Sequence, residues 1–502
     1  MKNIRKLLAL ALALVMALSV LPLALAKEVS YTQNCPYIYI HGFAANVLYD
    51  DPTSPDAKAI FPPETDAIMD TVKEALPAFA LYALNKDGDK LAESIVPVFL
   101  KLFEPVFLDN EGNVPNKSGV KFSYPSKSSI KANSNLEFGY DWRLDPVEIA
   151  AQLNDYIEYV CDASGCDKVT IMAHSCGGII TLAYATIYGT DRLQGVVMNS
   201  TAIYGQTYAG ELMTGDLTLS MEAVRAFMQY AMNETDYNTI VDGVFAIFEK
   251  AGLSDFLEKS GNQMIADAGE EIMSKVILPM FIHWPTVWAM TPDKYLEDAN
   301  EFIFNGTLID PETDYTTLKA KIENYNTTVR AGKTEKLIEM EDTMKFGVLA
   351  RYGFSTVPIT TSWDVMSDGI VDTKSASYGA TAANYGETLP AEYLSTVDAK
   401  YVSPDKTVDA STCLFPEKTW FVKGYGHTHS QLLPELTKAI LYSDEEVTVD
   451  TYEDYPRFMV YSDGDFTPQE SDNSANPFVK LAKFIKQIFS FIKMLFSKLT
   501  NN

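Results

Sequence analysis

The sequence predicts an α/β fold in which a mostly parallel sheet is covered by helices on both faces and carries a large helical cap insertion. Three observations predict it. Strand-like and helix-like segments alternate between residues 138 and 198, as is typical of parallel strands joined by crossover helices. A helix-rich stretch then covers residues 205–345, and the strand pattern resumes at Phe346. The third observation is a tight strand-to-helix turn centred on Ser175.

The N-terminus resembles a secretory signal peptide over residues 1–26. Basic residues come first, residues 7–23 are apolar, and Ala24-Leu25-Ala26 has the small side chains of a cleavage site. The alternative is an uncleaved membrane anchor, because the apolar run approaches spanning length. Because a signal peptide is removed from the mature protein, we exclude residues 1–26 from the fold and expect a secreted, extracellular protein.

The charge of the remaining chain limits its partners. The whole sequence has a formal net charge of −27, and removal of the three basic residues of the signal leaves −30. Residues 477–502 contain five Lys and no Asp or Glu, so residues 27–476 carry −35. A body this acidic repels phosphate backbones, and we therefore expect no nucleic-acid partner.

The cysteine and histidine content gives little support to metal chemistry. The five cysteines are Cys35, Cys161, Cys166, Cys176 and Cys413. Their odd number leaves at least one thiol unpaired in an exported chain, and the spacing of Cys161 and Cys166 does not by itself show a disulfide. The chain has five His and neither a CxxC pair nor an HExxH motif. We expect no metal and no cofactor.

The alternation also delimits the segments of the chain. A buried strand at residues 37–40 runs into His41-Gly42-Phe43, and a helix begins after Asp145, an acidic N-cap that precedes Pro146. The predicted segments are the first part of the core at 27–204 with an insertion at 51–135, the helical cap at 205–345, the second part of the core at 346–462, a linker at 463–477, and a basic amphipathic helix at 478–502.

Residues 169–178 fit a nucleophile elbow, a tight turn between a buried strand and an apolar helix that presents a nucleophilic side chain. Ser175 is the expected nucleophile, with small residues two positions before it and two positions after it. The N–H groups at the start of the helix suit an oxyanion, and the backbone of Cys176 supplies one candidate donor. The second expected donor is the Phe43 N–H, in the loop after the earlier strand. An ordinary Ser in a surface turn is the alternative.

A Ser nucleophile needs a base, and the base needs an acid that orients it. His427 and His429 both follow a strand-like run, and both are candidates for the base. Asp368 follows another strand-like run and completes the chain order Ser, Asp, His of α/β-hydrolases. Asp364 and Asp372 are alternatives for the acid.

With these residues in place, the chain resembles the lecithin:cholesterol acyltransferase-like lipases and acyltransferases of the α/β-hydrolase superfamily. The resemblance covers roughly residues 35–435 and is most specific around residues 138–180. The stretches that carry it are Tyr140-Asp141-Trp142-Arg143, Ala173-His174-Ser175-Cys176-Gly177-Gly178, residues 284–292 and Asp368-Gly369-Ile370-Val371.

The resemblance implies an acyl-enzyme at Ser175, an acid at Asp368 and a base in the loop that holds both histidines. Related lipases often place Ser-x-Leu-Leu directly after the base, and His429 precedes Ser430-Gln431-Leu432-Leu433. We therefore predict His429 as the base, with His427 as the alternative. The implied function is that of a secreted serine esterase, lipase or O-acyltransferase that acts on acyl esters of lipids, with water or an alcohol as the acceptor.

The C-terminal segment 478–502 places its five Lys on one side of a helix and Phe, Ile and Leu on the other. Such a helix suits the surface of an anionic membrane. The alternative is a helix docked on its own acidic body.

Two other functions are left open. The same fold accommodates an esterase or peptidase that acts on small soluble substrates, because a fold does not fix its substrate. A non-catalytic, lipid-binding relative is the second alternative, although the presence of all three triad residue types argues against it.

Overall fold

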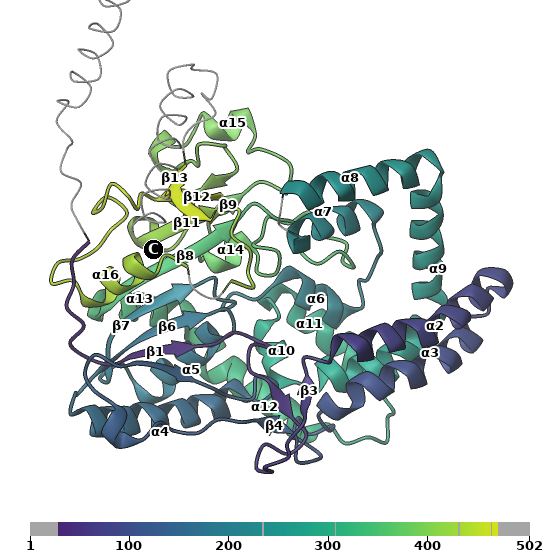
Figure 1. Ribbon diagram of the computed structural model, residues 1–502, viewed down its shortest axis with the longest axis horizontal. Helices are drawn as coiled ribbons and strands as arrows, with labels where there is room; N and C mark the ends of the chain where they lie inside the picture. The colour runs from purple at the N-terminus through teal and green to yellow at the C-terminus, as the bar shows by residue number, and fades with distance from the viewer. Residues whose placement is uncertain (1–28, 233–234, 307, 430–431, 463, 470–502) are drawn as a thin grey trace, which may run out of the picture.

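The structure is a computed structural model that describes residues 29–232, 235–306, 308–429, 432–462 and 464–469 (Figure 1). The predicted signal peptide, most of the predicted linker and the predicted C-terminal helix lie outside the described residues.

An eight-stranded sheet lies at the centre of the fold, in the order β13-β12-β11-β8-β7-β6-β1-β5 (Figure 1). Its strands are β1 (Tyr37–Ile40), β5 (Asn135–Phe138), β6 (Val169–His174), β7 (Leu193–Asn199), β8 (Lys345–Tyr352), β11 (Thr419–Lys423), β12 (Phe458–Ser462) and β13 (Asp465–Pro468). Every neighbouring pair is parallel except β12 with β13. The predicted mostly parallel sheet is confirmed.

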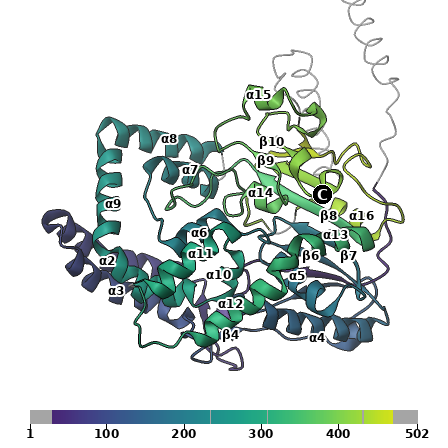
Figure 2. The ribbon, with the colours of Figure 1, turned by 180° about the vertical axis from the view of Figure 1, so that it is seen from behind.

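Helices cover both faces of the sheet. Successive side chains of each strand point to opposite faces, so both faces carry apolar side chains that must be buried. Ile171 and Val196 belong to one apolar cluster, and the next residues, Met172 and Val197, belong to the other. The helices of the first face are α4 (Pro146–Ser164), α5 (Gly177–Tyr188) and α13 (Lys333–Thr343), and α16 (Pro434–Tyr442) packs on the second (Figures 1 and 2).

The helix predicted from Asp145 is α4, and its ends follow from local chemistry. The Asp145 carboxylate accepts a hydrogen bond from the Val147 N–H at 2.9 Å, and Pro146 occupies the first helical position. Gly165 ends the helix with a φ of 74°, a left-handed conformation that glycine adopts at little cost.

The predicted insertion between β1 and β5 contains a small antiparallel sheet and two long helices. Its elements are β2 (Leu48–Tyr49), β3 (Ala59–Phe61), α2 (Thr65–Asn85), α3 (Gly88–Phe103) and β4 (Gly119–Val120). Helix α3 packs on α9 (Leu253–Ile272) of the cap, and the Tyr82 hydroxyl donates to Asp267 at 2.6 Å. These helices form an arm at one side of the molecule (Figure 1).

The segment between β7 and β8 is helical, as predicted. Its helices are α6 (Thr207–Thr214), α7 (Met221–Met232), α8 (Thr235–Lys250), α9 (Leu253–Ile272), α10 (Pro285–Met290), α11 (Leu296–Asn300), α12 (Thr316–Thr328) and α13, with π-helical turns at Met273–Ile282 and Glu301–Asn305. The predicted cap boundary at residue 345 is too late, because α13 packs on α5 and β8 and so covers the sheet.

A second connection, between β8 and β11, carries the predicted acid. It contains α14 (Thr373–Ala376), β9 (Thr381–Ala382), α15 (Ala391–Leu394) and β10 (Val408–Asp409). The linker predicted at 463–477 begins with a strand instead, because residues 465–468 pair with β12. Within the described ranges, no helix is long and apolar enough to cross a membrane.

Candidate active site

Ser175 lies in the turn between β6 and α5, where the sequence placed it. Its φ of 55° is left-handed, and the Gly178 N–H donates to the Ser175 carbonyl at 3.0 Å. A Cβ atom on Gly177 would lie 2.6 Å from the Ile40 carbonyl oxygen, and one on Gly178 would lie 2.4 Å from Thr201. The turn is therefore possible only with glycine at these two positions.

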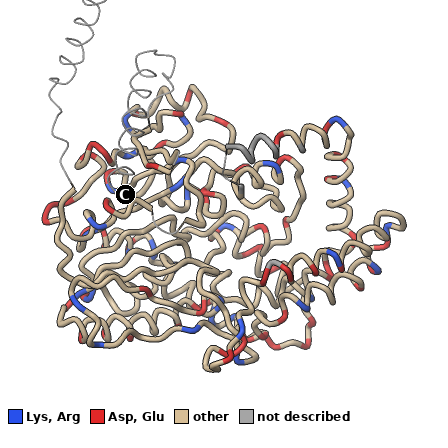
Figure 3. The backbone as a smooth tube through the Cα atoms, viewed as in Figure 1, with Lys and Arg blue, Asp and Glu red and all other residues tan. Residues whose placement is uncertain are grey.

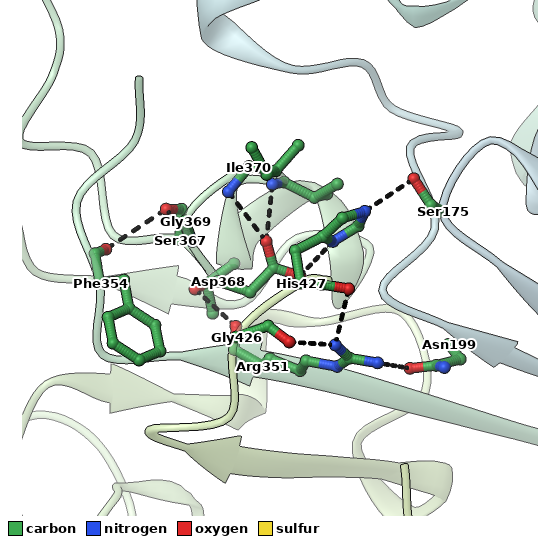
Figure 4. A network of polar contacts seen from close by, with 12 residues as sticks. Ser175, Asn199, Arg351, Phe354, Ser367, Asp368, Gly369, Ile370, Gly426 and His427 are labelled. Atoms are coloured by element: carbon green, nitrogen blue, oxygen red, sulfur yellow. Dashed lines mark hydrogen bonds and ion pairs between the residues drawn. The ribbon is translucent and has the colours of Figure 1, made fainter. Parts of the chain in front are cut away.

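A hydrogen-bonded chain joins Ser175, His427 and Asp368 (Figure 4). The His427 Nε2 lies 2.9 Å from the Ser175 Oγ, and the His427 Nδ1 lies 2.7 Å from the Asp368 Oδ2. The other carboxylate oxygen of Asp368 accepts the N–H groups of Ile370 at 3.1 Å and Val371 at 2.7 Å. The three side chains thus have the arrangement of nucleophile, base and orienting acid.

The preference for His429 over His427 is corrected by this geometry. The His429 N–H donates back to the Gly426 carbonyl at 3.2 Å, so the chain turns between the two histidines. The His429 ring is exposed and stacks on Tyr425 with ring centroids 4.8 Å apart, away from Ser175. The Ser-x-Leu-Leu pattern misled the choice because Leu432 and Leu433 are buried side chains at the start of α16.

The two alternative acids have other partners. Asp364 accepts a hydrogen bond from the Asn384 side chain at 2.9 Å. Asp372 accepts the backbone N–H and the hydroxyl of Thr207 at 2.9 and 2.6 Å, and so holds the first turn of α6. Burial raises the pKa of Asp372 to about 6, against the lowering effect of these hydrogen bonds. Neither carboxylate makes the hydrogen bond to His427 that Asp368 makes.

Asp368 is held ionised in a fully buried position. Burial alone would raise its pKa, because a carboxylate loses water on leaving solvent. The hydrogen bond and charge of His427, the positive charge of Arg351 and the Val371 N–H outweigh burial, and the pKa of Asp368 lies below its ordinary value. An ionised Asp368 can stabilise a protonated His427.

The other three histidines, His41, His174 and His283, take no part in the hydrogen-bonded chain from Ser175 to Asp368. His174 stacks on His427 with centroids 4.8 Å apart, and burial lowers the pKa of His174 well below its ordinary value. His41 pairs with Glu137 at 3.2 Å, and His283 of the cap contacts the Leu108 carbonyl of the insertion at 2.9 Å.

The loop after β1 lies directly against the nucleophile. A Cβ atom on Gly42 would come within 2.8 Å of the Ser175 Cβ, so the following Phe43 backbone is close to the reacting oxygen. Among the described residues, neither the Phe43 N–H nor the Cys176 N–H donates to another protein group. Both predicted donors are thus available to a ligand. Burial raises the pKa of the Cys176 thiol to about 12, which leaves it a neutral side chain.

The Tyr-Asp-Trp-Arg stretch fixes this loop. The Tyr140 hydroxyl donates to the His41 carbonyl at 2.7 Å, and the Trp142 indole donates to the Asn46 carbonyl at 2.9 Å. Asp141 and the buried Arg143 pair with each other through two hydrogen bonds, at 2.9 and 2.6 Å. The residues of this stretch, which carry part of the family resemblance, therefore shape the loop that contains Phe43.

The cap covers the site. Ser175 is only 2% exposed, and Tyr230 of α7 lies over the loops of the acid and the base. A Cβ atom on Gly369 would lie 2.3 Å from the Tyr230 ring, and one on Gly426 would lie 2.8 Å from it. The cap and the triad loops are therefore in direct contact.

Sequence reasoning missed Arg351 and Asn199. Arg351 lies on β8 beneath the base loop, and its guanidinium donates to the Asn199 side chain at 3.0 Å (Figure 4). A charged residue within a strand that is otherwise buried was the available signal, because a buried charge requires partners. Among the described residues, no group of three or more His, Cys, Asp or Glu is placed to hold a metal ion.

One sequence-family match agrees with this architecture. Residues 114–242, which contain β6 and Ser175, match the sequence family described as the alpha/beta hydrolase fold. Comparison with curated protein sequences gave no match. One similar solved chain comes from "The crystal structure of Tle4-Tli4 complex", with 15% identity and a TM-score of 0.20. The match covers 36% of this chain and about half, 48%, of that one. The chain has the α/β-hydrolase fold.

Proposed function

We propose that this protein is a secreted serine esterase, lipase or O-acyltransferase that acts on acyl esters of lipids through an acyl-Ser175 intermediate. The observation that carries the proposal is the hydrogen-bonded chain from Ser175 through His427 to the buried Asp368. A Ser with a base at 2.9 Å and an orienting carboxylate at 2.7 Å is arranged for acyl transfer.

In the first half-reaction, the Ser175 Oγ attacks the ester carbonyl while His427 Nε2 takes its proton. The carbonyl oxygen becomes an oxyanion, which the N–H groups of Phe43 and Cys176 stabilise at the start of α5. Asp368 stabilises the protonated His427, which then gives the proton to the leaving alcohol. The product is an ester between the acyl group and Ser175.

In the second half-reaction, His427 takes a proton from water or from an acceptor alcohol, which attacks the acyl-Ser175 carbonyl. The tetrahedral intermediate collapses, His427 returns the proton to the Ser175 oxygen, and a free acid or a new ester leaves. Access of the acceptor beneath the cap selects hydrolysis or acyl transfer.

A lipid substrate is favoured by the cap and by apolar side chains on the surface of the arm. Leu76 and Leu84 of α2 are 57% and 85% exposed, and Phe256 of α9 is 56% exposed. Helix α2 exposes six large apolar side chains in all, and apolar side chains that gather on one exposed element are typical of a surface that meets a lipid or protein partner: Ile68, Met69, Val72, Leu76, Leu81 and Leu84. The resemblance to the lecithin:cholesterol acyltransferase-like family supports the same substrate class.

The proposal is tested by labelling and by substrate choice. A serine-reactive phosphonate should label the purified protein, and Ser175→Ala should abolish both labelling and ester cleavage while the protein stays folded. Initial rates on p-nitrophenyl esters of graded chain length and on phospholipid vesicles then identify the acyl substrate. Ester cleavage that persists in Ser175→Ala would remove Ser175 from the mechanism, and a preference for short soluble esters would remove the lipid.

A further inference from the structure

Arg351 is a fully buried arginine, and among the described residues its side chain donates hydrogen bonds only to uncharged oxygens (Figure 4). One guanidinium nitrogen donates to the Gly426 and His427 carbonyls at 2.7 and 3.2 Å. A second donates to the Asn199 side-chain oxygen at 3.0 Å. A planar fork with several donors can hold these acceptors together, which a lysine cannot do.

These contacts reach the segments of the nucleophile and the base. Asn199 ends β7, and its backbone carbonyl accepts the Ser175 N–H at 3.0 Å, so its side chain and backbone connect Arg351 to the turn of Ser175. The carbonyls of Gly426 and His427 belong to the base loop itself. Arg351 is therefore hydrogen-bonded directly to the base loop and, through Asn199, indirectly to the turn of Ser175.

The acid segment is attached to the same residue. The Arg351 backbone carbonyl accepts the Thr373 hydroxyl at 2.9 Å, and the Thr373 N–H donates to the Met366 carbonyl at 2.9 Å. These two bonds tie the ends of the loop that carries Asp368 to β8. The positive charge of Arg351 also favours the ionised form of Asp368 and lowers its pKa.

We propose that Arg351 is a positioning residue, which holds the loops of Ser175, His427 and Asp368 in register from beneath and keeps the Ser175–His427 hydrogen bond at reacting distance. The inference rests on the proposed function, because it assigns Arg351 a role in the chemistry of that triad. A buried guanidinium is expensive to desolvate, and an apolar side chain of similar length would fill the same space at lower cost. The need to position the three loops explains why an arginine, rather than an apolar residue, occupies this buried place on β8.

The test compares Arg351→Met, which removes the donors, with Arg351→Lys, which keeps the charge without the fork. The control is Arg457→Met, because Arg457 is also buried and donates to backbone carbonyls, those of Pro416 and Lys400, and lies outside the triad; unlike Arg351, it also pairs with a carboxylate, that of Glu417 at 2.8 Å. The measurements are the second-order rate constant of Ser175 labelling by a fluorophosphonate and kcat and KM on the best p-nitrophenyl ester, each per folded molecule.

Arg351→Met should lower the labelling rate and kcat about 100-fold with KM within about twofold, because misplacement of reacting groups by about 1 Å costs this much. Arg351→Lys should recover part of the loss, and Arg457→Met should leave both rates unchanged. A folded Arg351→Met protein with the wild-type labelling rate and kcat would overturn the inference.

A second variant keeps the test valid if Arg351→Met does not fold. Asn199→Ala removes one acceptor of Arg351 but keeps the backbone carbonyl that binds the Ser175 N–H, and it should lower the labelling rate about tenfold. An unchanged rate in Asn199→Ala would then overturn the inference. Failure of the proposed function looks different, because the wild-type protein itself would not be labelled and would cleave no ester.

Discussion

Ser175 shows how one residue depends on its neighbours. Its left-handed φ of 55° is costly for a residue with a Cβ atom, and the turn keeps it through the Gly178 N–H and through the close approach of two glycines to β1 and Thr201. The conformation points the Oγ at His427 rather than into the sheet. Strain of this kind is tolerated where the surrounding packing fixes the backbone.

The two histidines of the base loop give the first residue-scale prediction. His427→Ala should lower kcat by at least about 1000-fold, because the triad acts as a unit and Ser175 would have no base. His429→Ala should lower kcat less than about threefold, since its ring stacks on Tyr425 at the surface. Steady-state kinetics on one ester compare the variants. A larger loss in His429→Ala would mean that the base loop changes conformation when substrate binds.

The two buried carboxylates give the second prediction. Asp368→Asn should lose most of kcat, because an amide cannot stabilise a protonated His427. Asp372→Asn should keep near-wild-type kcat, because its amide oxygen can still accept both hydrogen bonds from Thr207. The two variants are isosteric with the wild type, so each is the control for the other. Equal losses would show that Asp372 contributes to the chemistry as well.

The raised pKa of Asp372 also leads us to expect that the stability of the fold depends on pH. Its pKa of about 6 in the fold lies above the ordinary value near 4, so between these pH values the folded state binds the proton more tightly. The free energy of unfolding therefore decreases as pH rises through this window, by at most about 3 kcal/mol from this group. Asp372→Asn should be more stable than the wild type at pH 7.5 and show a smaller decrease.

Urea unfolding at pH 4.5 and 7.5 measures this difference. Some decrease should remain in Asp372→Asn, because burial also raises the pKa of Asp145 to about 6. An identical pH dependence in the two proteins would mean that Asp372 is solvated in solution.

At the scale of elements, α7 connects the cap to the triad. The Tyr230 ring packs against Phe354, with centroids 5.0 Å apart, and fills the space above Gly369 and Gly426. These glycines adjoin the acid and the base in sequence, so movement of α7 changes the packing of both loops. The cap is therefore mechanically linked to the residues that it covers.

Replacement of this ring tests the link. Tyr230→Ala should lower the free energy of unfolding by about 3 kcal/mol, the usual cost of removing a buried aromatic ring, and should lower kcat about tenfold. Tyr230→Phe should keep most of both, because the ring makes these contacts. Met228→Ala, on the more exposed side of the same helix, is the control. Urea unfolding and ester kinetics provide the readouts. An unchanged kcat in a destabilised Tyr230→Ala would separate the cap from the chemistry.

At the scale of the whole molecule, charge separates the body from its C-terminal segment. Acidic residues occur along the whole described chain (Figure 3), and residues 27–476 carry −35 whereas residues 477–502 carry five Lys. The segment lies outside the described residues, and its role as a membrane-binding helix stays a proposal. Each Lys near an anionic bilayer contributes about 1 kcal/mol, which is screened by salt.

Truncation after Pro477 tests the membrane proposal. The truncated protein should sediment less with anionic vesicles and cleave vesicle-borne lipid more slowly, while its kcat on a soluble short-chain ester should stay within about twofold. The last expectation follows because Ser175, Asp368 and His427 all precede the cut. Raising salt should weaken vesicle binding of the full-length protein. Equal sedimentation of both proteins at low salt would mean that the segment docks on its own body.

The sequence by itself determined the parts of the fold that depend on local patterns. Alternating apolar strands and amphipathic helices predicted the parallel sheet and its two covered faces, because burial imposes those periods on the chain. The turn at Ser175 was predictable because its backbone requires small residues at fixed positions. The order of Ser, Asp and His along the chain also directed the choice of Asp368.

Only the tertiary structure decided which side chains meet. His427 and His429 are two residues apart, and the direction of each ring depends on a turn closed by one hydrogen bond, so local pattern could not rank them. The contacts of Arg351 with Asn199 and with the base loop join positions far apart in sequence. The strand at 465–468 likewise forms only because β12 offers an open edge. Contacts across the sheet decide such features, because a local window contains only one of the two partners.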